Sequence, residues 1–150
     1  TLVTKTMNTA LRLLRSMVTQ IKEVDTAMTN LRKVTEATGN QLNTFLESAG
    51  KRSVDLGASL TDYIDAVSEF SRLGKALDEA QKLGELATTY KTVAEDLDIK
   101  TASKSIISTM QAFSGVGVQA EEIVDKFNYV GKMLPLITIS VTVQRWMRPS

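Results

Sequence analysis

Residues 59–74 read SLTDYIDAVSEFSRLG, and they open a stretch that continues to Gly115 and decides the fold. In this segment apolar residues recur every three or four positions, which places them on one face of an α-helix. The same spacing recurs in two further segments, separated by short polar or glycine-containing joints. Each helix is too short to be stable in water alone, so we expect their apolar faces to pack together. The residues predicted for this core are Leu60, Ile64, Val67, Phe70, Leu83, Leu86, Tyr90, Val93, Leu97, Ile106, Met110, Phe113, Ile123 and Phe127.

The composition points away from catalysis. The chain has 150 residues, 43% of them hydrophobic, which suits one folded domain. It contains no cysteine and no histidine. Disulfides and thiolate metal sites are therefore excluded, and the most common general base and transition-metal ligand is missing. We predict a protein that is not an enzyme and uses no cofactor or metal.

Charge is distributed unevenly along the chain. Residues 1–38 carry a net charge of +3, residues 39–131 carry −5, and residues 132–150 carry +3. An acidic middle is unfavourable for wrapping a polyanion, so the sequence indicates no direct nucleic-acid site. It indicates no small-molecule substrate either.

The first 38 residues form the longest uninterrupted helical pattern. Apolar residues follow a heptad repeat over about four heptads, with Leu11 and Val18 widening the stripe. Two interpretations stay open: a coiled-coil seam between copies of the chain, or a long helix that folds back on its own domain. We predict a homo-oligomer, and the candidate interface residues are Met7, Leu14, Met17, Ile21, Val24, Met28 and Leu31.

The helix boundaries follow from capping residues and glycines. Gly39 is expected to end the first helix and Asn40 to cap the second, which ends near Gly50 or continues to Gly57. Ser59 and Asp98 are expected to act as N-caps, and Gly74 to end the helix that Ser59 begins. Residues 119–130 are predicted to form a last helix.

The predicted fold is all-α, with a long amphipathic helix in residues 1–38 and four to five short antiparallel helices in residues 39–131. Residues 132–150 form an atypical tail that is irregular as a whole. Within it, Leu134 to Val143 is β-branched and alternating, which is typical of a strand. The change in character near Lys132 suggests a shifted reading frame or an artificial end.

The middle of the chain resembles the N-terminal region of phage tail tape measure proteins from long-tailed phages and prophages of Gram-positive bacteria. One carrier of the resemblance is EVDTAMTNLRKVT at residues 23–35. The other is the order of helix boundaries: Leu73-Gly74, AEDLDI at residues 94–99 leading into Ala102, and FSG at residues 113–115 before AEE at residues 120–122. The resemblance covers roughly residues 10–131.

This resemblance implies a structural protein of the virion tail. Such a protein sets tail length through its helical extent, because each helical residue adds a fixed rise. It occupies the lumen of the tail tube until DNA ejection, and lies in the host cytoplasm during assembly. The implied partners are the tail tube protein and tail assembly chaperones.

Two other functions are alternatives to this one. One is a coiled-coil-like protein-interaction module of a secreted or signalling protein. The other is a peptidoglycan-lytic enzyme using Glu47, which is followed by a serine as in lysozyme-like transglycosylases. A catalytic acid needs a cleft that raises its pKa, whereas Glu47 falls opposite the apolar stripe of its helix. The acidic residues Asp62, Asp65 and Glu69 are interpreted as an exposed face, and Asp96 and Asp98 as helix-ending and capping residues.

Overall fold

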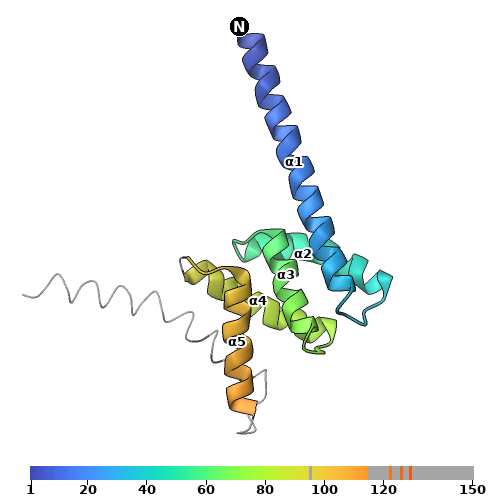
Figure 1. The fold of residues 1–150 in the computed structure, drawn as a ribbon, viewed down its shortest axis with the longest axis vertical. Helices are drawn as coiled ribbons and strands as arrows, with labels where there is room; N and C mark the ends of the chain where they lie inside the picture. Colours follow the sequence, from blue (N-terminus) through green and yellow to red (C-terminus); the bar gives the residue numbers. More distant parts are fainter. Residues whose placement is uncertain (95, 115–121, 123–125, 127–128, 130–150) are drawn as a thin grey trace, which may run out of the picture.

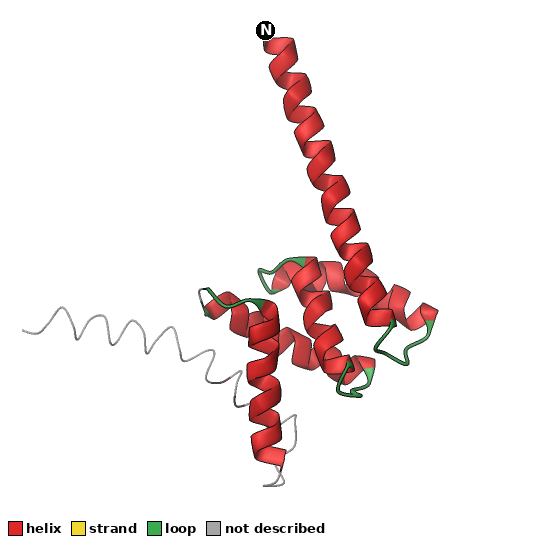
Figure 2. Cartoon of the chain, in the orientation of Figure 1, coloured by secondary structure: helices red, strands yellow, loops and turns green. Residues whose placement is uncertain are grey.

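A computed structural model describes residues 1–94, 96–114, 122, 126 and 129 (Figure 1). Within these residues the structure is all-helical and contains no strand (Figure 2). The five helices are α1 (Leu2–Arg32), α2 (Gly39–Asp55), α3 (Leu60–Ser71), α4 (Leu77–Val93) and α5 (Ile99–Ser114). The predicted fold class is confirmed: a long first helix precedes an array of shorter ones. The predicted strand at residues 134–143 lies outside the described residues, as does nearly all of the predicted helix at 119–130.

The helix α3 is the centre of the array, since it contacts each of the other four helices. The C-terminal part of α1 packs against it, while the rest of α1 projects away from the array (Figure 1). At about 1.5 Å per residue, α1 is about 47 Å long. The described residues therefore form a small helical body, made of α2–α5 and the C-terminal end of α1, and one long arm, made of the rest of α1.

Side-chain caps set several helix starts. Ser59 Oγ accepts a hydrogen bond from the backbone N–H of Asp62 (3.1 Å), and Asp98 Oδ1 accepts one from the N–H of Thr101 (3.0 Å). Gly74 follows α3 with a φ of +78°, a backbone conformation that glycine adopts without strain. The two predicted N-caps are confirmed, whereas α3 ends at Ser71, before Gly74, which lies in the turn that follows.

The boundary between α1 and α2 differs from the prediction. α1 ends at Arg32, before Gly39, and Gly39 is the first residue of α2. The cap is Thr38, whose hydroxyl accepts from the N–H of Gln41, while Gln41 Oε1 accepts from the N–H of Thr38. This reciprocal capping box satisfies two otherwise free N–H groups. The N-cap of α2 therefore lies two residues before the predicted cap, Asn40. α2 then continues through Gly50 to Asp55, which agrees with the longer of the two predicted helices.

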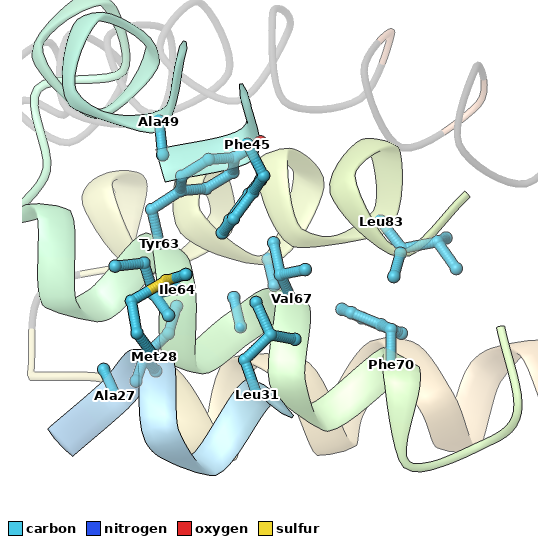
Figure 3. Close-up of a cluster of buried hydrophobic side chains, with 14 of the residues drawn as sticks. Ala27, Met28, Leu31, Phe45, Ala49, Tyr63, Ile64, Val67, Phe70 and Leu83 are labelled. Atoms are coloured by element: carbon cyan, nitrogen blue, oxygen red, sulfur yellow. The ribbon is translucent and has the colours of Figure 1, made fainter. Parts of the chain in front are cut away.

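The core lies where α1, α2, α4 and α5 meet α3 (Figure 3). Ile64, Val67 and Phe70 of α3 are fully buried. Phe45 of α2 and Tyr63 of α3 stack at a tilt, with ring centroids 5.9 Å apart. Of the predicted core, the structure also buries Leu83, Leu86 and Ile106, and half-buries Leu60, Tyr90, Leu97 and Met110; Ile123 and Phe127 lie outside the described residues.

Two predicted core residues are exposed. Val93 is 42% exposed and Phe113 is 47% exposed. Val93 is the last residue of α4, and Phe113 lies in the last turn of α5. Periodicity assigns a residue to the apolar face of its helix, but it does not say how far the neighbouring helix extends. Both residues lie at the C-terminal ends of their helices, where no neighbouring element among the described residues covers them.

Candidate functional site

The candidate site is the apolar face of the projecting part of α1. Every residue from Thr1 to Glu23 is exposed. This segment nevertheless carries, on or beside one seam, large hydrophobic side chains that are between 46% and 71% exposed: Val3, Met7, Leu11, Leu13, Leu14, Met17, Val18 and Ile21. We call this set the arm face. A contiguous apolar surface of this kind marks an interaction site in a folded protein.

The predicted seam is divided between two environments. Met28 and Leu31 are buried in the chain's own core, and Val24 is half-buried against it. Met7, Leu14, Met17 and Ile21 are all at least 59% exposed. The last heptad of the pattern therefore serves the fold of one chain, as the fold-back interpretation has it. The preceding heptads have no partner among the described residues.

The charges of the arm lie away from its apolar face. In the heptad frame Lys5 and Arg12 share one outward position, and Arg15 and Lys22 share another. No charged residue stands on the seam or immediately beside it between Leu2 and Val24. Two copies that meet through this face therefore keep their positive charges in water.

Ion pairs join the helices of the body, and hydroxyl groups are buried between them. Arg52 of α2 binds Glu85 of α4 (Nε to Oε1, 2.7 Å), and Lys91 of α4 binds Asp62 of α3 (Nζ to Oδ2, 2.5 Å). The buried hydroxyl of Thr88 donates to the carbonyl of Gly84 in the same helix (2.7 Å). Because such hydroxyls are satisfied within their own helix, they can be buried where helices pack closely.

The acidic residues on α3 are less exposed than predicted. Asp62, Asp65 and Glu69 are all half-buried, because α4 and α5 pack beside them. Burial raises the pKa of Asp65, and the neighbouring Asp62 carboxylate raises it further. Within the described part of the chain, no cluster of acidic residues is arranged to hold a metal ion.

The remaining candidates from the sequence fall on the surface. Glu47 is exposed on α2, on the side away from the buried Phe45 and Ala49. Asp96 follows α4 with a φ of +71°, which matches its predicted role at a helix end. A hydrogen bond from the Thr101 hydroxyl lowers the pKa of Asp98, which is consistent with a capping carboxylate.

One feature was not predicted from the sequence. An open cleft of about 890 Å³ lies between the α1–α2 connection with the adjoining half of α2 and the α3–α4 connection. Its lining contains Glu36 and Asp78 but also Arg72 and Lys75, so no charge sign dominates. About half of its lining residues lie in these two connections, where periodicity carries no signal.

No model of a known protein family matches the chain, and no solved structure matches it. Within the described residues, none of the helices combines the length and apolarity needed to cross a membrane.

Proposed function

We propose that this chain is a structural assembly module that acts by helix–helix association through the arm face. The observation that carries the proposal is the exposed apolar arm itself. Residues 1–23 gain nothing from packing on the body, since all of them are exposed. Most of the stability of a helix in a protein comes from packing of its apolar face, so the arm gains stability when a partner covers it.

The energetics favour association. Fully burying one large apolar side chain contributes roughly 1.5–3 kcal/mol. The eight side chains of the arm face are already partly covered by their own helix, so each contributes less than that. Their sum over two copies is nevertheless of the same order as the 4–15 kcal/mol that association costs in lost freedom. Self-association is therefore within reach of this face without any further contact.

We further propose, on the resemblance of residues 10–131, that the module belongs to a phage tail tape measure protein. In that setting the protein is not an enzyme, lies in the lumen of the virion tail, and meets the tail tube protein and tail assembly chaperones in the host cytoplasm. The long helical arm supports this proposal, because a helix converts residue number into distance at a fixed rise.

The tape measure proposal is tested in the parent gene. It expects a reading frame that encodes a very long helical chain around these residues. Deleting helical residues downstream of the module should shorten the tail by about 1.5 Å per residue, measured by electron microscopy of the particles. Tails of unchanged length would refute the ruler function, and a short parent chain would favour a protein-interaction module of another kind.

A further inference from the structure

We propose that the partner on the arm face is a second copy of the chain bound antiparallel, with Val3 of one copy opposite Ile21 of the other. This inference rests on the proposed self-association and adds its orientation and register. In an antiparallel pair the heptads of the two helices run in opposite directions. A residue at one seam position of the first copy therefore lies opposite a residue at the other seam position of the second copy. In a parallel pair each position meets itself.

The sizes of the seam residues fit the antiparallel pairing. Ala10 is the smallest residue of the seam, and Leu14 lies one turn further along on the other seam position. An antiparallel pair places Ala10 against the partner's Leu14, which fills the layer. A parallel pair places Ala10 against the partner's Ala10 and leaves that layer underfilled, with lost packing contacts. The proposed layers are Val3 with Ile21, Met7 with Met17, and Ala10 with Leu14, each occurring twice.

The position of the body favours the same orientation. Met28 and Leu31 continue the seam in the heptad frame, and both are buried against the body of their own chain. The body therefore occupies the seam from Val24 onward, and a partner helix cannot follow the seam past this point. In a parallel pair both bodies would need this space at the same level. In an antiparallel pair they lie at opposite ends of the paired arms.

The length of the arm face agrees with this arrangement. The exposed seam runs from Val3 to Ile21, which is about 27 Å at the helical rise. When Val3 faces the partner's Ile21, the two exposed seams overlap completely. The last layer then lies just before Val24, where the body begins. Leu11, Leu13 and Val18 flank the seam and extend the apolar cover on both sides.

Disulfide cross-linking tests the orientation, because the 150-residue chain contains no cysteine of its own. Two single variants, Val3→Cys and Ile21→Cys, are prepared, one with a mass tag, then mixed and oxidised. Both positions are exposed, so the body should fold unchanged. We expect the mixed disulfide between position 3 and position 21 to make up well over half of the cross-linked product. Arg12→Cys is the matched control: it lies at the middle of the pair but points outward, and should not cross-link.

Disulfides that join like positions, 3 to 3 and 21 to 21, would overturn the antiparallel orientation while leaving self-association in place. Random pairing, with mixed product at one half, would overturn the proposed register. Sedimentation of the unmodified chain as a monomer, together with no cross-link in any mixture, would overturn the self-association on which the inference rests.

Discussion

Gly84 of α4 faces Val67 of α3 so closely that a side chain has no room: a Cβ atom at Gly84 would lie 2.8 Å from Val67 Cγ2 and 3.2 Å from the Val67 backbone nitrogen. The glycine therefore sets the distance between the two helices. Val67 and Gly84 are both buried, so their contact lies inside the core. Neither helix can shift locally without disturbing Phe70 and Leu83 beside them (Figure 3).

We predict that Gly84→Ala destabilises the protein by about 1 kcal/mol. Overpacking costs about 1–3 kcal/mol, and replacing a helical glycine returns up to about 1 kcal/mol of helix propensity. Gly50→Ala is the matched control, because nothing lies within 4 Å of its added Cβ. It should stabilise the protein in the same urea-unfolding experiment. Equal stabilisation by both substitutions would contradict the close contact.

The buried Tyr63 should make stability sensitive to alkaline pH. Burial raises its pKa to about 12, and the Glu85 carboxylate adds to the rise. The phenol is then neutral in the folded state at a pH where it ionises in the unfolded chain, whose pKa is about 10. Its contribution is fully present below pH 10 and is lost as the pH rises from about 10 to about 12.

That loss should be on the order of 2–3 kcal/mol in the free energy of unfolding, measured by denaturant titration across this pH range. Tyr63→Phe removes the ionising group, so its stability should decline less steeply above pH 10. Tyr90→Phe removes the same group from a half-buried position and serves as the control. An identical alkaline slope in Tyr63→Phe and the unmutated chain would be incompatible with this account.

The helix caps predict a reciprocal pair of substitutions. Ser59 caps α3 with a hydrogen bond, while the N-cap residue of α4 is Ala76, which makes no side-chain cap. Ser59→Ala should destabilise the protein by about 1 kcal/mol, and Ala76→Ser should stabilise it by a similar amount. Thermal unfolding of both variants checks the pair. Two shifts in the same direction would show that capping is not the cause.

Hydrogen exchange should separate the arm from the body. Amide protons in residues 5–23 should exchange faster on dilution, because the arm is protected only when a partner covers it. Those in α3 should exchange at a rate that does not depend on protein concentration, since α3 is held by contacts within the chain. Concentration-independent exchange in the arm would indicate that it is not stabilised by association.

Periodicity predicted the helices and most of the core, because each apolar face had to be covered by something. It could not predict what covers each face. Ile21 and Met28 share one heptad position, yet Ile21 is 68% exposed and Met28 is 3% exposed. Both residues are large and apolar, so their heptad position alone does not distinguish them. The environment changes because α3 reaches one level of α1 and not the other.

The start of α2 depends on which of two neighbouring residues acts as its N-cap. Asn40 and Thr38 are both acceptable N-caps, and only Thr38 has a glutamine three residues later to complete the reciprocal pair. The cleft lined by Ser71 and Lys75 was not predicted because its shape depends on how two connections come together. Its walls are separated in sequence, so no single segment indicates it.

The most direct test of the central claim compares two lysine substitutions one heptad apart, Ile21→Lys and Met28→Lys, by sedimentation equilibrium and circular dichroism. The unmutated chain should sediment as an oligomer whose mass falls toward 16.4 kDa on dilution. Ile21→Lys should sediment as a folded monomer, because the charge blocks only the arm face. Met28→Lys should unfold the body, because it buries an uncompensated charge. An unmutated chain that remains monomeric at every concentration, or an Ile21→Lys variant that associates as well as the unmutated chain, would contradict the account.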